Sequence, residues 1–323
     1  MRNTNSPIIR QHDFHLNSLT GGDEINELSF GEFNKRMYMA VGDDDGDIRI
    51  IDTVPNYAST TNSTAKRTAS SNTPCPSSTT NTLTHNPEAS ALVTSIAFRP
   101  QTKNIDIATA GTDCSICLWD VCRPKRPSSI LQVSREEAEG ANQVCNPPIV
   151  HSLSWSPSGR LLAAGCGDGS VMVMRVDGRR LVEQCRLQGG HESAVATILF
   201  PHFNGTANIS SHVAADDRLM VSGGNDSVIY LWDLGASVAG DAAVDPSMVL
   251  QGCSTSNSTL SSDVNSAFSG LSISTEPRVL FGIPHEKKLN WIVSSKSTEQ
   301  VFSTTLFVAD TTNDITAYML PTV

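Results

Sequence analysis

Acidic turns are the first residues in this sequence whose types and spacing could bind a metal ion. The run Asp43-Asp44-Asp45-Gly46-Asp47 places carboxylates at alternate positions of a loop, which is how a calcium-binding loop begins. However, Ile48 stands where that loop needs a glycine, and Val54 stands where it needs a bidentate Glu. We therefore interpret the run as a solvated hairpin turn.

Cysteines form a second candidate metal site. Cys114 and Cys117, with Cys122 nearby, have part of a zinc-binding spacing, but no second Cys pair or His pair accompanies them. Side chains along a hairpin also alternate between its two faces, which separates these thiols. The eight cysteines are spread over a long chain, so a disulfide framework is not expected either. We predict no metal and no cofactor.

Catalytic motifs are the third possibility. His191-Glu192 and His285-Glu286 each lack the second His of a zinc-protease helix, and no G-x-S-x-G motif is present. The glycines of Gly165–Gly169 lack the spacing of a phosphate-binding loop, and a strand instead of a helix is expected to follow them. We predict no catalytic residues and no enzymatic activity.

The elements that carry these turns repeat along the chain. Five segments show apolar alternation, a tight Gly/Asp turn and a second alternating run, which is the pattern of a β-hairpin. Each is preceded by a further predicted strand. The hairpins are predicted at Tyr38–Asp52, Ile107–Val121, Leu161–Val176, Leu219–Leu234 and Leu306–Leu320.

Units of three or four short strands cannot bury their own faces, so they must stack against one another, and radial stacking limits the number of open sheet edges. The sequence therefore predicts an all-β protein, a single β-propeller domain over residues 1–323 with five visible blades. We expect these blades near residues 22–52, 85–121, 149–176, 190–234 and 285–320.

The repeats resemble the WD-repeat family most clearly where Gly190-His191 opens a unit and Leu231-Trp232-Asp233 closes its third strand. In that family, a buried hydrogen-bonded chain of His, Ser or Thr, Asp and Trp stabilises each blade. The resemblance assigns this structural role to His191, Ser222, Asp226 and Trp232, and in the second unit to His85, Thr109, Asp113 and Trp119. The other three units are degenerate, with Ile51, Met174 and Tyr318 at the Trp position.

The order of the repeats resembles the WD repeat-containing protein 53 family over nearly the whole chain. The similarity rests on the segments around His12–His15, Ile96–Gln101, Gly223–Asp226 and Leu289–Trp291. That family has seven blades, so the resemblance implies either that two blades are missing from this sequence or that five blades close a ring. The last unit stops after its third strand, and residues 6–17 are the candidate latch strand that would complete it.

Two low-complexity inserts interrupt the repeats. Residues 53–80 and 236–277 are rich in Ser, Thr and Asn and cannot bury enough apolar surface to offset the entropy of ordering. We expect both to be disordered and to lie between the third and fourth strands of their blades, on the same face of the propeller.

The charge balance constrains the partners. The chain has 23 Lys and Arg against 33 Asp and Glu, a net charge of −10, which argues against nucleic acid as the main partner. No apolar run approaches the roughly 18 residues of a membrane span, and the N-terminus has no signal-peptide core. We expect no membrane association and an intracellular protein, cytoplasmic, nuclear or both.

These features predict a non-enzymatic scaffold that binds other proteins. In some WD-repeat proteins, a Trp-Asp-x-Arg box docks on the adaptor of a cullin-RING ubiquitin ligase, and that resemblance makes Arg123 a candidate partner-binding residue. Cys122 occupies the Arg position of the box, so Arg123 comes one residue late. The alternative is a propeller enzyme or small-ligand binder using the central channel, but the inner strands show no repeated acid or base, only residues such as Ser95, Ser152 and Ser154.

Overall fold

The computed structural model describes residues 24–53, 81–86, 91–134, 147–201, 217–235, 276–296 and 302–321. The predicted inserts at 53–80 and 236–277 lie outside these ranges except for their end residues. The candidate latch strand at 6–17 also lies outside them.

The described residues are nearly all β-strand and form five antiparallel sheets. The first sheet contains β1 (Ile25–Phe33), β2 (Arg36–Asp43), β3 (Asp47–Asp52) and β4 (Asn81–Thr84). The second contains β5 (Val93–Phe98), β6 (Asp106–Gly111), β7 (Ser115–Asp120) and β8 (Ser129–Gln132). The third contains β9 (Val150–Trp155), β10 (Leu161–Cys166), β11 (Val171–Asp177) and β12 (Arg180–Leu187). The fourth contains β13 (Val195–Leu199), β14 (Leu219–Gly224), β15 (Val228–Asp233) and β16 (Arg278–Pro284), and the fifth contains β17 (Leu289–Lys296), β18 (Phe302–Asp310) and β19 (Ile315–Pro321).

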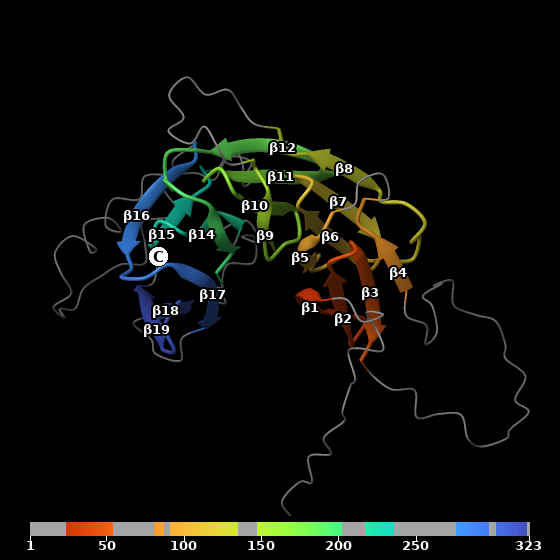
Figure 1. Cartoon of the computed structure of the whole chain (residues 1–323), viewed down its shortest axis with the longest axis horizontal. Coiled ribbons are helices and arrows are strands. Elements are labelled where there is room, and N and C mark those ends of the chain that lie inside the picture. Colours follow the sequence, from red (N-terminus) through yellow and green to blue (C-terminus); the bar gives the residue numbers. More distant parts are fainter. Residues whose placement is uncertain are drawn as a thin grey trace, which may run out of the picture.

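The sheets are arranged as the blades of a propeller, with β1, β5, β9, β13 and β17 innermost (Figure 1). The predicted fold class, an all-β propeller with five blades, is confirmed. The described residues form an open arc of blades and not a closed ring, because a gap separates the first sheet from the fifth (Figure 1). The fifth sheet has three strands, so the outer edge of β19 has no neighbouring strand among the described residues.

Tight turns between the second and third strands explain why the hairpins form where the sequence predicts them. Residues at the same turn position adopt positive φ in four blades: Gly46 (83°), Cys114 (62°), Gly169 (85°) and Ser227 (62°). Glycine adopts this backbone conformation without steric cost, whereas Cys and Ser do so under strain. The turn geometry is therefore kept even where the sequence does not supply glycine.

The hydrophobic core consists of four clusters, each lying between two successive blades. Between the first two blades, Ile48 and Leu83 pack with Ile107 and Trp119. The Phe98 side chain packs closely against the Gly31 backbone here, since a Cβ atom on Gly31 would lie 2.3 Å from Cγ of Phe98. Each inner blade is thus stabilised on both faces.

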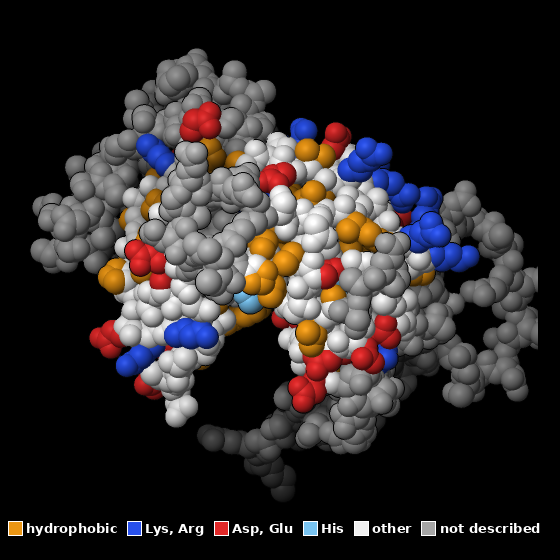
Figure 2. Space-filling view, turned by 45° about the horizontal axis from the view of Figure 1, so that its top comes forward, with side chains coloured by type: hydrophobic (Ala, Val, Ile, Leu, Met, Phe, Trp, Pro, Cys, Tyr) orange, Lys and Arg blue, Asp and Glu red, His pale blue; other side chains and the backbone are white. Residues whose placement is uncertain are grey.

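The two ends of the arc each leave one sheet face without a neighbouring blade. In the fifth blade the register places Trp291, Val293, Phe307, Ile315 and Met319 on one face, and all five are exposed, Ile315 by 70%. In the first blade Leu28 and Phe30 are exposed on β1, Phe30 by 61%. The space-filling view shows the opening between these two blades (Figure 2). Both ends therefore present apolar surface of the kind that is buried between inner blades.

Candidate functional site

A buried chain of polar side chains crosses the fourth blade. Trp232 Nε1 donates to Ser222 Oγ at 2.7 Å, and Ser222 Oγ lies 2.7 Å from His191 Nε2. His191 Nδ1 lies 3.1 Å from both carboxylate oxygens of Asp226. The structure therefore brings together all four residues that the WD-repeat resemblance assigned to this blade.

The hydrogen-bond directions in this network follow from the donors available. Trp232 only donates, so the Ser222 hydroxyl accepts from it and donates its own proton to His191 Nε2. The Nδ1–H of His191 then donates to Asp226, which assigns the tautomer from the network. Burial opposes ionisation of Asp226, but hydrogen bonds from His191 and from the backbone N–H groups of Glu192 and Val228 lower its pKa overall.

The order Asp226, His191, Ser222 is also that of a nucleophilic triad, in which the serine attacks a substrate. Ser222 has no solvent exposure, and its oxygen already accepts the Trp232 N–H. An attacking serine needs an open side facing a substrate and nearby donors for an oxyanion. The burial of Ser222 leaves no such side, so the network is suited to stabilising the blade.

The second blade contains a similar network with one additional member. Trp119 Nε1 donates to Thr109 Oγ1 at 3.0 Å, and Thr109 Oγ1 lies 2.8 Å from His85 Nδ1. His85 Nε2 lies 3.1 Å from Ser115 Oγ and 3.4 Å from Asp113 Oδ1. His85 thus occupies the histidine position that the resemblance assigned to it. Ser115, in contrast, was not predicted from the sequence.

Asp113 is held in its charged form by several donors. Burial of the carboxyl opposes ionisation, but hydrogen bonds from His85, Asn86 and Ser115 lower its pKa well below the usual range. The Asn86 contact is short, with Nδ2 2.7 Å from Asp113 Oδ2. This carboxylate therefore ties the strand-entry segment at His85 and Asn86 to the β6–β7 turn.

The fifth blade holds a third network that the sequence did not predict. His285 Nδ1 lies 2.8 Å from the Tyr318 hydroxyl, and His285 Nε2 lies 2.9 Å from Asp310 Oδ2. The Thr312 side chain and backbone N–H donate to Asp310 and, with His285, lower the pKa of that carboxyl to about 2. By strand register, Tyr318 takes the Trp232 position and Asp310 takes the position of Gly224.

In the described parts of the first and third blades, no such network is present at the corresponding positions. Val41 and Ala164 stand where the second and fourth blades have a hydroxyl, and Ile51 and Met174 stand at the Trp position. The turn carboxylates are kept but serve their own turns: Asp168 Oδ1 accepts from the Ser170 hydroxyl at 2.6 Å. These two blades rely on apolar packing instead.

Hydroxyl groups on the inner strands connect neighbouring blades. Ser95 Oγ accepts the Leu153 N–H at 3.0 Å, and Ser152 Oγ accepts the Ile198 N–H at 3.1 Å. Ser154 Oγ accepts the Phe200 N–H at 3.3 Å in the same way. These three serines are the inner-strand residues that the sequence analysis considered for a site in the central channel. In the structure their hydroxyls form hydrogen bonds between neighbouring blades.

The candidate metal-binding turns serve structural roles in the described residues. Asp43 is buried and accepts the Asp47 N–H at 2.8 Å across its own turn. Cys117 is buried, its thiol donates to the His85 carbonyl at 3.2 Å, and burial raises the thiol pKa to about 12. Within the described part of the chain, no group of three or more His, Cys, Asp or Glu is placed to hold a metal ion.

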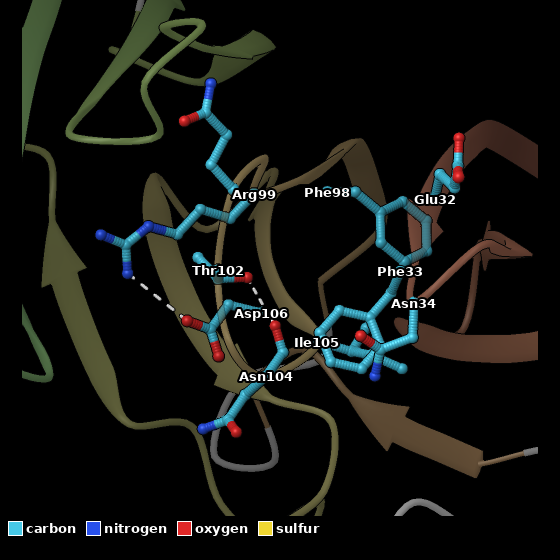
Figure 3. A pocket seen from close by; sticks show the side chains of 10 residues that line it. Glu32, Phe33, Asn34, Phe98, Arg99, Thr102, Asn104, Ile105 and Asp106 are labelled. Carbon is cyan, nitrogen blue, oxygen red and sulfur yellow. Dashed lines mark hydrogen bonds and ion pairs between the residues drawn. The ribbon is translucent and has the colours of Figure 1, made fainter.

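A small pocket lies between the β1–β2 turn and the β5–β6 connection (Figure 3). Its volume is about 130 Å³, and Phe33, Phe98 and Ile105 form its apolar side. Arg99 and Asp106 also line it, but they pair with each other at 3.4 Å (Figure 3). Pockets for small molecules usually measure roughly 300–1,000 Å³, so this one lacks the space of a ligand site.

Arg123 lies in the loop that follows β7 and is 72% exposed at its side chain. The loop is held by Asp120, whose carbonyl accepts the Arg123 N–H at 2.7 Å and whose Oδ1 accepts the Cys122 N–H at 3.0 Å. The Asp120 carboxylate is buried and also accepts from Arg179 Nη2, in the third blade, at 2.6 Å. Arg123 Nε lies farther from that carboxylate, at 3.9 Å.

The described residues include no helix with the length and hydrophobicity that a membrane span requires.

Comparison with known proteins identifies the repeats. The model of the WD domain, G-beta repeat, matches residues 77–120 and 183–233, and that of the anaphase-promoting complex subunit 4 WD40 domain matches residues 128–200. The WD repeat-containing protein 53 homolog of Dictyostelium discoideum is 23% identical over 322 residues, covering 96% of this chain and 71% of the relative. The WD repeat-containing protein VIP3 of Arabidopsis thaliana is 32% identical over 104 residues, 32% of this chain and 31% of the relative. The protein transport protein SEC13 of Mycosarcoma maydis is 31% identical over 88 residues, 26% of this chain and 24% of the relative.

These matches agree with the resemblance seen in the sequence. The chain carries WD40 repeats and is similar over nearly its whole length to the WD repeat-containing protein 53 homolog. WD-repeat proteins generally mediate interactions between proteins.

Proposed function

Because the chain carries WD40 repeats, we propose that it is a non-enzymatic scaffold that binds other proteins on the loops of its blade array. A rigid array of sheets presents loops in fixed positions, which is sufficient for recognition without a catalytic site. The polar networks around His191, His85 and His285 act in this proposal as structural supports of the blades. The compartment we propose is intracellular.

The more specific form of the proposal is a substrate receptor of a cullin-RING ubiquitin ligase. Its support is the position of Arg123, an exposed cation in a loop held against the end of β7. In this form Arg123 substitutes for the Arg of the Trp-Asp-x-Arg box, one position after half-buried Cys122.

The test compares three tagged full-length chains expressed in cells: wild type, Arg123→Ala and Lys103→Ala. Lys103 is a matched control because it is an exposed cation in another loop, between β5 and β6. Affinity mass spectrometry measures the recovery of the cullin-RING adaptor. We expect the wild type and Lys103→Ala to recover it and Arg123→Ala to lose about 90% of it, since a central interface Arg can contribute about 2 kcal/mol or more.

Two results would contradict parts of this proposal. Equal adaptor recovery by all three chains would remove Arg123 from the interface. Absence of the adaptor from all of them, with another assembly recovered, would overturn the ligase form and leave the general scaffold role.

A further inference from the structure

Two basic turns that are far apart in the sequence meet on one surface. The first is Arg123-Pro124-Lys125-Arg126, between β7 and β8, and the second is Arg179-Arg180, where the turn after β11 leads into β12. They are joined by the buried Asp120 carboxylate, which accepts from Arg179 at 2.6 Å and lies 3.9 Å from Arg123. We call these five cations the basic surface.

The outer strands keep the two turns side by side. Leu181 N–H, next to Arg180, donates to Ser129 Oγ on β8 at 3.1 Å. The first turn is closed by the Ser128 N–H, which donates to the Leu118 carbonyl at 2.6 Å, and its backbone is stiffened by Pro124 and Pro127. The backbone of the two turns therefore loses little conformational entropy when a partner binds, and the cost falls on the exposed side chains.

Among the described residues, few acidic groups neutralise the charge on this surface. All five cations belong to exposed residues. Asp120 can balance one of them, and exposed Asp177, which lies opposite Arg180 in the strand register, can balance another. The concentration is unusual for a chain with a net charge of −10. Lys and Arg side chains gather along the upper right rim of the molecule (Figure 2).

We infer that the basic surface is a docking site for a short acidic segment of a partner protein, rich in Asp and Glu. Arg guanidinium groups bind carboxylates through paired hydrogen bonds, and two turns in fixed positions offer several such contacts at once. The size of the surface favours a short segment. A nucleic acid longer than the surface would extend onto a chain whose net charge is −10, which disfavours binding of its phosphates. A short segment confined to the surface is screened from charges more than roughly 8 Å away at physiological salt.

This inference builds on the proposed scaffold function, because Arg123 belongs to both. The test therefore leaves Arg123 unchanged. The variant Arg126→Glu/Arg180→Glu reverses one charge on each turn and keeps Arg179, which holds Asp120. The control Lys287→Glu/Lys288→Glu makes the same change in net charge at two exposed lysines between β16 and β17, away from the basic surface.

The probe is a fluorescent peptide of alternating Glu and Asp, followed by polarisation with the full chain at low and physiological salt. We expect the wild type and the control to bind it alike, with affinity that falls as salt rises, and the Arg126→Glu/Arg180→Glu variant to bind at least about tenfold more weakly. Thermal unfolding of each variant checks that the fold is retained. Equal binding by variant and control, or no binding by the wild type at low salt, would overturn the inference.

Parallel titrations decide between classes of partner. The alternative probes are single-stranded DNA of similar length and vesicles containing phosphatidylserine. If either binds more tightly than the peptide through the same residues, the acidic-segment inference is overturned. The adaptor experiment on Arg123→Ala remains separate. Loss of peptide binding in the double variant with no adaptor recovered by any chain would support the acidic-segment site and contradict only the ligase form.

Discussion

The Tyr318 hydroxyl lies 2.8 Å from His285 Nδ1 and makes directly the connection to histidine that Trp232 makes through Ser222 in the fourth blade. Val308 occupies the Ser222 position of the fifth blade, so no hydroxyl is available there to mediate the contact. The Tyr318 phenol carries its own oxygen, so no bridging hydroxyl is needed between this ring and His285.

Replacing Tyr318 by Phe should therefore destabilise the chain by about 1 kcal/mol, because His285 loses a hydrogen bond while the ring packing is kept. Denaturant unfolding measures the effect. Tyr230→Phe is the matched control, since no described residue is hydrogen-bonded to the Tyr230 hydroxyl, which lies on β15. Equal effects of the two substitutions would refute a specific role for the Tyr318 contact.

Asp113→Asn should change how stability depends on acidity. The pKa of Asp113 is lowered in the folded state, so its stabilising contribution is present above the unfolded value of about 3.9 and is lost as the pH falls toward the folded value. We expect the variant to lose about 1–3 kcal/mol at pH 7 and to show a shallower loss of stability below pH 4. Asp45→Asn, at the same turn position in the first blade and exposed, is the control and should change neither quantity appreciably.

Glu27 should make stability depend on pH in the opposite direction to Asp113. Burial raises its pKa to about 7, so the folded chain holds a proton that the unfolded chain releases above about pH 4.3. Stability should fall as the pH rises from 4.3 to 7, because the folded state must then bury a carboxylate. In Glu27→Gln this decrease should disappear, whereas Glu32→Gln, on the exposed side of β1, should retain it. Unfolding midpoints at pH 5 and pH 8 distinguish the two outcomes.

The exposed face of the fifth blade predicts a tendency to associate. Ile315→Thr/Met319→Thr should lower both light scattering and binding of a hydrophobic dye, because large exposed apolar patches promote association. Ile130→Thr removes an exposed apolar side chain from β8, away from this face, and should have little effect. A similar decrease in both variants would show that the end face is not the cause.

Local sequence patterns predicted the repeated hairpins, and the resemblance to WD repeats assigned most residues of two polar networks, although it did not include Ser115. The turn residues and the Trp-Asp pairs lie within single blades, so their spacing along the chain carries the information. The network of His285, Asp310 and Tyr318 uses different positions from the other two networks. Its carboxylate comes from the end of β18 instead of the hairpin turn. Its one sequence signal was the aromatic Tyr318 at the Trp position.

Contacts between blades could not be predicted in this way. The sequence gives no reason for Asp120 to pair with Arg179, since the contact depends on how the second and third blades are placed. The same applies to Ser152, whose hydroxyl accepts a backbone N–H from the next blade. The gap in the arc likewise depends on the arrangement of all five blades.

The open arc also affects how the protein unfolds. In a linear array, stability is approximately the sum of each unit and its contacts with nearest neighbours, so a terminal unit has one stabilising neighbour where an inner unit has two. The first and fifth blades should consequently open in smaller, local transitions, and amide hydrogen exchange should be fastest in them and slowest in β9–β12. Such a molecule behaves as a short one-dimensional chain of cooperating sheets, with fluctuations concentrated at its two ends.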